Sequence, residues 1–321
     1  MSDTEFDIIR RYFTRQVPGR GDVITGIGDD AALLQVPAGM ELVVCMDTLV
    51  DGVHFPAGTP AAAIGHKALA VNLSDLAAMG AEPAWATLSL TIPESDPVWL
   101  ADFSQAFFKL ADCYQLQLVG GDTTRGPLSV TVQAHGFVPD GQALRRQGAQ
   151  AGDHIYVTGT LGDAGLALHS GEHAGDVLRQ RLDFPEPRIA AGLLLRDHAS
   201  AAIDISDGLL ADLGHLLAAD DLGASLNIDE LPRSAAFKAA ILQPAMFHEL
   251  PLSAGDDYEL CFTVPKRACK VMEGALSNQS IDFTAIGVIE QTSGIRCRKA
   301  DGGLYESATA GYQHFGVSGN G

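Results

Sequence analysis

Apolar and polar positions in the first half of the chain recur with two different periods, which predict helices and strands in turn. A spacing of three to four residues between apolar side chains predicts helices over 5–13, 61–79 and 97–113. Alternating or continuous apolar runs predict strands over 41–50, 86–92 and 128–134. The 61–79 segment consists largely of good helix formers, and Gly80 and Pro83 follow it, as is typical of a helix C-terminus.

The second half has the same mixture of periods. Strands are predicted over 154–158, 201–205, 224–228, 258–264, 283–289 and 295–298. Helices are predicted after Gly162 and over 188–198, 209–219 and 266–276. A polar, glycine-bearing segment at 142–152 separates the two halves. We therefore predict an α/β protein of two domains, residues 1–141 and 142–321, each a sandwich of helices on a mixed sheet.

Composition and charge limit the classes of partner. The hydrophobic fraction of 46% and the charged fraction of 19% are ordinary for a globular protein. The 40 acids exceed the 21 Lys and Arg, and the net charge of −19 argues against binding to nucleic acid or to an anionic membrane. The same charge repels ATP unless metal ions lie between the acids and the phosphates. The five cysteines form no CxxC pair, and neither a signal peptide nor a membrane span is recognisable, so we expect a cytoplasmic location.

Several acids stand inside apolar segments, where a charge is costly without a partner. Asp75 and Asn72 are among the few polar residues of the 61–79 helix and share one of its faces. Asp47 follows the apolar run 42–46, and Asp204 lies within the strand 201–205. The plain alternatives are a solvated stripe on the helix and an acid that ends a strand. We favour ligand roles, most clearly for Asp75 and Asp204.

Other acids accompany glycines in loops. The run 119–126 leads from an apolar approach into Gly120, Gly121 and Asp122, and the plain alternative is a hairpin turn with polar residues at its tip. Asp29 and Asp30 lie in a glycine loop, and Ser206 and Asp207 precede a helix that either one could cap. Glycines let a backbone approach a phosphate closely, and a strand end beside a helix N-terminus is a common phosphate site.

Together these acids predict a site for phosphoryl transfer. Carboxylates gathered from separate elements repel one another unless divalent cations neutralise them, and oxygen ligands of this kind suit Mg²⁺. The acids concerned are Asp29 or Asp30, Asp47, Asp75, Asp122, Asp204 and Asp207. We predict that they converge on Mg²⁺ ions shared with bound phosphates.

Two other classes of function are considered. The run from Gly26 to Ala31 has the form GxGxxA, which would suit a nicotinamide-dependent oxidoreductase, although Asp29 and Asp30 would then face a pyrophosphate directly. A non-catalytic, metal-binding dimer is the other alternative. The chain has no GxxxxGK[ST] motif, and His169 and His173 lack the HExxH context of a zinc site.

Seven runs of residues, in order along nearly the whole chain, resemble the thiamine-monophosphate kinase family. This family belongs to the superfamily of aminoimidazole ribonucleotide synthetase and selenophosphate synthetase. The runs are 26–33, 47–55, 67–81, 120–126, 203–208, 255–260 and 311–315. The N-terminal segment has no cysteine with a neighbouring lysine, which argues against a selenophosphate synthetase.

The resemblance implies an aminoimidazole ribonucleotide synthetase-like fold and a homodimer in which the N-terminal domains share a sheet or barrel. It also implies transfer of the γ-phosphoryl group of ATP to thiamine monophosphate, the last step of thiamine diphosphate biosynthesis. Several Mg²⁺ ions would be bound at Asp30, Cys45, Met46, Asp47, Asp75, Asp122, Asp204 and Asp207, and the catalytic residues would be Asp30, Asp75, Asp122 and Asp207. ATP would contact Gly121, Asp122, Arg146 and Ser206, and the thiamine side would contact His54, Asp256 and Tyr312.

The chain departs from the family pattern at two places. Cys45 and Met46 replace residues that often carry hydroxyl groups, so a metal contact here would use backbone carbonyls or water. Asp256 stands where the family has glutamate, and its side chain is about one methylene shorter.

Overall fold

The computed structural model describes residues 4–15, 19–309 and 311–312, and the chain divides into two compact units, Met1–Ala143 and Leu144–Gly321. Each unit combines a β-sheet with helices, which confirms the predicted α/β class. Among the described residues, no helix has both the length and the apolar character needed to cross a membrane.

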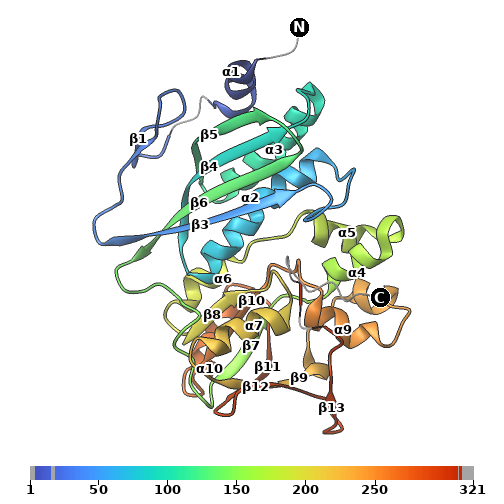
Figure 1. Ribbon diagram of the computed structural model, residues 1–321. Coiled ribbons are helices and arrows are strands. Elements are labelled where there is room, and N and C mark those ends of the chain that lie inside the picture. The colour runs from blue at the N-terminus through green and yellow to red at the C-terminus, as the bar shows by residue number, and fades with distance from the viewer. Residues whose placement is uncertain (1–3, 16–18, 310, 313–321) are drawn as a thin grey trace. The chain divides into compact units, whose positions relative to one another are not determined.

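Unit 1 is built on a four-stranded sheet with the strand order β3-β6-β4-β5. The strands are β3 (Met40–Val50), β6 (Ser129–Pro139), β4 (Glu82–Ile92) and β5 (Gln117–Arg125). β6 pairs antiparallel with β3 and β4, whereas β4 and β5 run parallel. Helices α2 (Ala61–Ala78) and α3 (Pro97–Cys113) lie behind this sheet in the view of Figure 1. The open edges are therefore β3 and β5.

Close packing of α2 on α3 depends on one glycine. A Cβ added to Gly65 would collide with the backbone oxygen of Phe103, so the two helices approach more closely than a side chain would allow. Nearly every residue of α2 is buried, and this includes the polar Asn72 and Ser74. α3 begins at a capped end, because Asp96 accepts a hydrogen bond of 2.8 Å from the N–H of Val98 and Pro97 fits the first turn.

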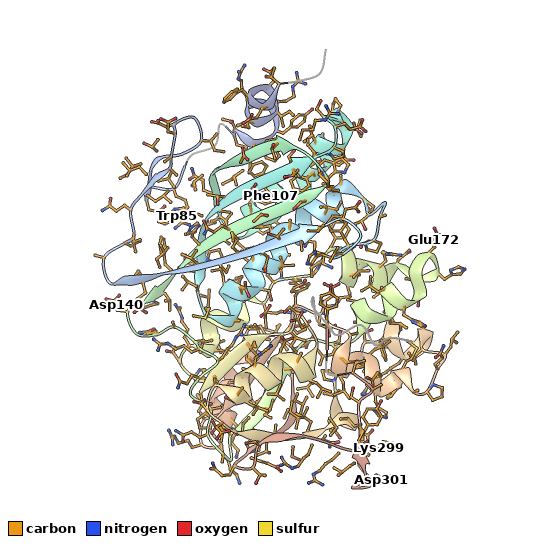
Figure 2. The ribbon with its side chains drawn as sticks, viewed as in Figure 1. Trp85, Phe107, Asp140, Glu172, Lys299 and Asp301 are labelled. Carbon is orange, nitrogen blue, oxygen red and sulfur yellow. The ribbon has the colours of Figure 1, made fainter. Side chains whose placement is uncertain are left out.

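The sheet face away from α2 and α3 is only partly covered. At one end, the small hairpin of β1 (Val23–Thr25) and β2 (Leu33–Leu34) packs on a cluster that contains Trp85 and Phe137. Their rings meet edge to face at 4.9 Å, and Figure 2 shows Trp85 on this unit. Farther along β3, Val44 and Met46 are exposed.

Unit 2 is built on a seven-stranded sheet with the order β13-β12-β9-β11-β7-β10-β8. The strands are β7 (His154–Thr158), β8 (Ala201–Asp204), β9 (Gly223–Asn227), β10 (Leu260–Val264), β11 (Phe283–Glu290), β12 (Gly294–Arg298) and β13 (Leu304–Tyr305). Only β12 and β9 pair in parallel among these described strands. The two larger sheets described are therefore mixed, as predicted.

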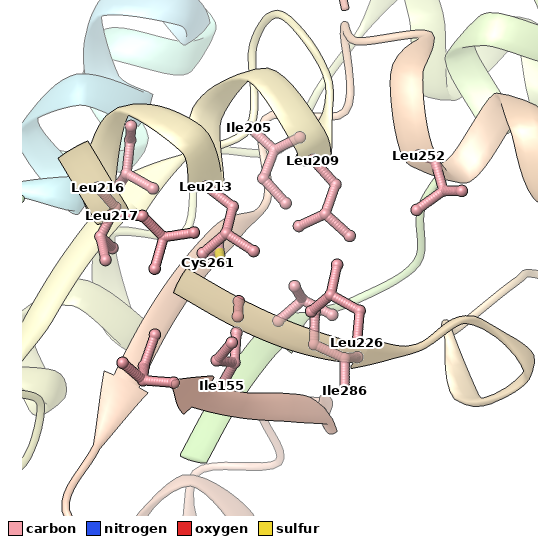
Figure 3. Packing of buried hydrophobic residues seen from close by; sticks show 14 of the residues in the cluster. Ile155, Ile205, Leu209, Leu213, Leu216, Leu217, Leu226, Leu252, Cys261 and Ile286 are labelled. Carbon is pink, nitrogen blue, oxygen red and sulfur yellow. The ribbon is translucent and has the colours of Figure 1, made fainter. Parts of the chain in front are cut away.

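Helix α7 (Leu209–Ala218) covers part of this sheet with an apolar stripe. Leu209, Leu213 and Leu216 recur every three to four residues and join a core that includes Ile155 and Cys261 of the sheet (Figure 3). This packing fixes where α7 begins, directly after the loop that carries Ser206 and Asp207.

The remaining helices are mostly short. They are α1 (Glu5–Ile8), a π-helical turn (Ile9–Phe13), α4 (Asp163–Ser170), α5 (Asp176–Asp183), α6 (Ile189–Leu195), α8 (Ala235–Ala240), α9 (Met246–Ser253) and α10 (Cys269–Asn278), with single 3₁₀ turns at Gly171–His173 and Ile228–Glu230. The helix predicted over 188–198 is shorter than expected, and α5, α8 and α9 were not predicted.

The run around Gly120 and Gly121 corrects one expectation. It is neither a loop nor a hairpin tip, because β5 continues through it to Arg125. A Cβ on Gly121 would collide with the backbone oxygen of Leu88 on β4. The glycine therefore serves close strand pairing, and its φ of +151° is open to glycine but strained for other residues.

Candidate active site

The predicted site residues lie on both units. In unit 1, β3 carries Cys45, Met46 and Asp47. The Cys45 thiol faces α2 and donates to the backbone oxygen of Asn72 at 3.3 Å. Asp47, two residues further on, points to the same side of the sheet and is half-buried. The side chain of Met46 points to the opposite face and is 62% exposed.

The helix α2 presents Asn72 and Asp75 one turn apart. Asn72 is fully buried, and its amide nitrogen donates to the backbone oxygen of Ala68 at 3.0 Å. Its Oδ1 atom has no hydrogen-bond partner within the part of the chain that the structure describes. Asp75 is half-buried. The contact between Cys45 and Asn72 joins the strand that carries Asp47 to the helix that carries Asp75.

Asp122 lies apart from Asp47 within this unit. Three strand spacings of about 4.8 Å separate β3 from β5, so the two edges are ~14 Å apart. Asp122 of β5 lies opposite Ser89 of β4, and Ser89 lies opposite Thr131 of β6. Thr131 in turn lies opposite Thr48 of β3. Thr48 and Thr131 have their hydroxyl oxygens 2.9 Å apart. Since cross-strand partners share a face, Asp122 and Asp47 point to opposite faces of the sheet.

Asp30 and His54 occupy connections at the ends of strands. Asp30 is exposed in the turn between β1 and β2, where its N–H donates to the Asp29 carboxylate at 2.8 Å. The GxGxxA run thus leads from one strand to another and not into a helix, so it lacks the structural context of a dinucleotide site. His54 follows β3 and accepts the Val50 N–H at its Nδ1 atom at 3.0 Å, which leaves the proton of the neutral ring on Nε2.

In unit 2, the predicted residues gather around the loop 206–208. Asp204 ends β8 and is 5% exposed, which confirms the burial inferred for this acid. Ser206 and Asp207 follow, both half-buried. Arg146 is exposed beside the same strand, where the backbone oxygen of its neighbour Arg145 accepts the Ala202 N–H at 2.9 Å.

Two of the three residues predicted for the thiamine side, Asp256 and Tyr312, contact the same loop, whereas His54 belongs to unit 1. The Asp256 N–H donates to the backbone oxygen of Ser206 at 2.9 Å, and the Tyr312 N–H donates to that of Asp207 at 3.0 Å. Asp256 has a φ of +61°, a strained value for a residue with a side chain, and its carboxylate accepts the Tyr258 hydroxyl at 3.0 Å. Gly255 permits this approach, because a Cβ there would lie 2.5 Å from the Ser206 oxygen.

One residue of this cluster was not predicted from the sequence. Asp212 of α7 accepts three consecutive backbone N–H groups on its Oδ2 atom, from Ser206 at 3.0 Å, Asp207 at 3.0 Å and Gly208 at 3.1 Å. Burial raises the pKa of the Asp212 carboxyl to about 7, and the charges of Asp204 and Asp207 add to the rise, against the effect of the N–H donors. The signal in the sequence was an acid early in the helix after a Ser-Asp-Gly turn.

A buried ion cluster supports the segment on the other side of Asp256. Glu259 is fully buried and pairs with Arg181 at 2.6 Å and Arg188 at 2.6 Å. Asp257 accepts the Gly162 N–H at 2.9 Å on one oxygen. These groups anchor the chain on both sides of Tyr258, so the strained backbone at Asp256 is held by buried contacts.

The acids of both units offer oxygen donors that suit Mg²⁺. Within residues 4–15, 19–309 and 311–312, no three His, Cys, Asp or Glu side chains form a group that could hold a metal ion. Mg²⁺ usually binds through one or two carboxylates and keeps water and substrate phosphates as its other ligands. In unit 2, a cation would relieve the repulsion among Asp204, Asp207 and Asp212. In unit 1, the buried Asn72 oxygen, which has no hydrogen-bond partner among the described residues, is a further oxygen donor. The residues present therefore fit Mg²⁺.

Family models define the class of protein. The model of the AIR synthase related protein N-terminal domain matches residues 28–138, and the model of the corresponding C-terminal domain matches residues 150–299. Together they cover most of the chain. The protein is therefore a two-domain member of the AIR synthase related proteins.

Individual relatives narrow this class. Thiamine-monophosphate kinase of Escherichia coli (strain K12) is 48% identical over 323 residues, which cover 98% of this chain and 99% of that protein. The crystal structure of thiamine-monophosphate kinase from Stenotrophomonas maltophilia K279a has 49% identity and a TM-score of 0.82, and covers 86% of this chain and 91% of that one. A structure described as AaThiL complexed with AMPPCP and TMP has 32% identity and a TM-score of 0.75, and the match covers 90% of this chain and 92% of that one. The chain belongs to the thiamine-monophosphate kinase family, which confirms the predicted family and the predicted kind of enzyme.

Proposed function

We propose that the protein transfers the γ-phosphoryl group of ATP to thiamine monophosphate, giving thiamine diphosphate and ADP. The observation that carries this proposal is the loop 206–208, which bears the Ser206 hydroxyl and the Asp207 carboxylate and whose backbone oxygens accept the N–H groups of Asp256 and Tyr312, two of the residues predicted for the thiamine side. Such an arrangement presents groups for a nucleotide phosphate and for an acceptor on one rigid segment. The relatives of nearly full length, one of them solved with AMPPCP and TMP, support the same substrates.

The chain's own residues divide into two roles. Gly121, Asp122, Arg146 and Ser206 bind ATP: the glycine backbone approaches the phosphates, and the exposed guanidinium of Arg146 spreads their charge. His54, Asp256 and Tyr312 bind thiamine monophosphate. Tyr312 is 45% exposed and offers an aromatic face to the cationic thiazolium ring.

We propose that several Mg²⁺ ions are held by Asp30, Asp47, Asp75, Asp122, Asp204 and Asp207, with backbone oxygens or water at Cys45 and Met46. Asp47 and Asp122 would hold different ions, because they point to opposite faces of the sheet. When bound, the ions neutralise the phosphates and stabilise the charge that develops in transfer. Without them, the carboxylates repel a triphosphate. Asp30, Asp75, Asp122 and Asp207 are the acids we expect to matter most for turnover.

We also propose a homodimer formed through unit 1. On the sheet face away from the helices, Leu42, Val44 and Met46 are 42%, 48% and 62% exposed, and they line the edge strand β3. An apolar stripe in water marks an association surface, and an edge strand is a template for pairing with another chain. A second copy of this chain is the partner that the family resemblance implies. A cytoplasmic location stays a prediction.

The test is incubation of the purified protein with ATP, Mg²⁺ and thiamine monophosphate, followed by chromatography. We expect thiamine diphosphate and ADP in equal amounts, and no product without Mg²⁺ or with thiamine in place of its monophosphate. ADP release without thiamine diphosphate would refute the proposed acceptor.

A further inference from the structure

The loop 206–208 directs its backbone groups in two directions. All three of its N–H groups point to the Oδ2 atom of Asp212, at 3.0, 3.0 and 3.1 Å. The backbone oxygens of Ser206 and Asp207 accept from the N–H groups of Asp256 and Tyr312, whereas the backbone oxygen of Gly208 accepts the Asp212 N–H as the helix begins. One carboxylate oxygen of Asp212 thus binds the three N–H groups of the loop, while Asp256 and Tyr312 bind two of its backbone oxygens.

Asp212 is not an ordinary helix cap. The N-cap position of α7 is Gly208, and no side chain caps it. Asp212 is the fourth residue of the helix, and its partners precede the helix instead of belonging to its first turn. A cap would satisfy the helix's own N–H groups, whereas this carboxylate satisfies those of the loop.

The position is also electrostatically costly. Asp212 is 4% exposed, and the carboxylates of Asp204 and Asp207 repel it. A buried charge needs charge-assisted hydrogen bonds, and the three loop N–H groups supply them. Removal of the carboxylate therefore leaves three N–H groups to find new partners, and the loop must change its backbone conformation.

We infer that Asp212 is a positioning residue, which holds the loop 206–208 so that Ser206, Asp207, Asp256 and Tyr312 stand in one arrangement for both substrates. The inference rests on the proposed function for its catalytic consequence. Its structural part, the fixing of three amides by one carboxylate, is testable without any substrate.

The first experiment measures amide hydrogen exchange of the 205–209 segment in wild type, Asp212→Asn and Asp212→Ala. Hydrogen bonds to a charged group are strong enough that their loss speeds exchange by about tenfold or more, and we expect this in Asp212→Ala with a smaller effect in Asp212→Asn. Asp229→Asn is the matched control: its carboxylate, in the same unit, accepts a single N–H, from Ala300 at 2.6 Å. Unchanged exchange in folded Asp212→Ala would overturn the inference.

The second experiment measures KM and kcat for ATP and for thiamine monophosphate in the same variants. A displaced loop raises KM for both substrates and lowers kcat. We expect kcat/KM to fall by about a hundredfold in Asp212→Ala, and by less in Asp212→Asn. A variant that is only less stable would lose active enzyme and keep both KM values. Unchanged KM values for both substrates in Asp212→Ala would refute the positioning role. Absence of turnover in the wild-type protein would instead refute the proposed function, and the hydrogen-exchange result would then decide the role of Asp212.

Discussion

Two buried carboxylates of unit 2 have opposite electrostatic surroundings. Burial alone would raise the pKa of Glu259, but Arg188 and Arg181 outweigh it and hold the pKa below its ordinary value. Burial raises the pKa of Asp257 well above its ordinary value, and the Gly162 N–H and Arg181 oppose this only in part. The Oδ2 atom of Asp257 has no hydrogen-bond partner among the described residues. The charged form of Asp257 is therefore the unfavourable one in the folded protein.

This difference predicts a pH dependence of stability. A carboxyl with a raised folded pKa binds more protons in the folded state, so its contribution to stability falls as the pH rises above its unfolded pKa of about 3.9. Asp257→Asn removes this loss and keeps an oxygen for the Gly162 N–H. In urea unfolding we expect the variant to gain on wild type as the pH rises above about 4, by at most about 1.4 kcal/mol per pH unit. If the free energies of unfolding of Asp257→Asn and wild type change in parallel with pH, Asp257 is not protonated in the folded protein.

Neutral substitutions of two acids in unit 1 should lower turnover without affecting folding. Asp75→Asn and Asp122→Asn keep the size of each side chain and remove its charge, so we expect normal unfolding temperatures and a loss of kcat of at least about a hundredfold. Asp140→Asn, an exposed acid in a turn of the same unit, is the control and should keep full activity. Near-normal kcat in both site variants would exclude these two acids from the reaction.

At the scale of elements, two helical glycines with different surroundings predict opposite effects of substitution by alanine. Gly65→Ala places a methyl group against the Phe103 backbone oxygen, and we expect a loss of about 1–3 kcal/mol in the free energy of unfolding. Gly274→Ala in α10 meets no atom within 4 Å and should stabilise by about 0.5–1 kcal/mol. Denaturant unfolding of both variants measures this, and a Gly65→Ala protein as stable as wild type would show that the helices can separate without cost.

Periodicity predicted most elements of unit 1 because its strands and its two long helices carry strong apolar patterns. It missed α5, α8 and α9, which have eight, six and eight residues and are too short to repeat the helical period clearly. The buried acid Asp204 was predictable from its apolar neighbours. Asp212 was not, because its partners are backbone N–H groups and its helix has an ordinary amphipathic pattern. That Asp47 and Asp122 lie on opposite faces depends on strand register, which the pattern does not contain.

At the scale of the whole molecule, the exposed stripe on β3 predicts how the proposed dimer would be broken. Met46→Lys places a charge at the most exposed residue of this stripe, where burial would then be unfavourable. We expect light scattering after gel filtration to show a monomer for Met46→Lys and a dimer for wild type. Val98→Lys is the matched control, since Val98 is 68% exposed on α3 of the same unit. A dimeric Met46→Lys protein would exclude this face as the interface.

The central claim is that the aspartates of both units act on the phosphates through Mg²⁺. Calorimetric titration with AMPPCP, in Mg²⁺ and then in EDTA, tests it most directly. The account predicts binding in Mg²⁺ and a loss of roughly a hundredfold or more in affinity in EDTA, because without a cation these carboxylates, in a protein with a net charge of −19, repel the triphosphate. Equal affinity in both buffers would contradict it.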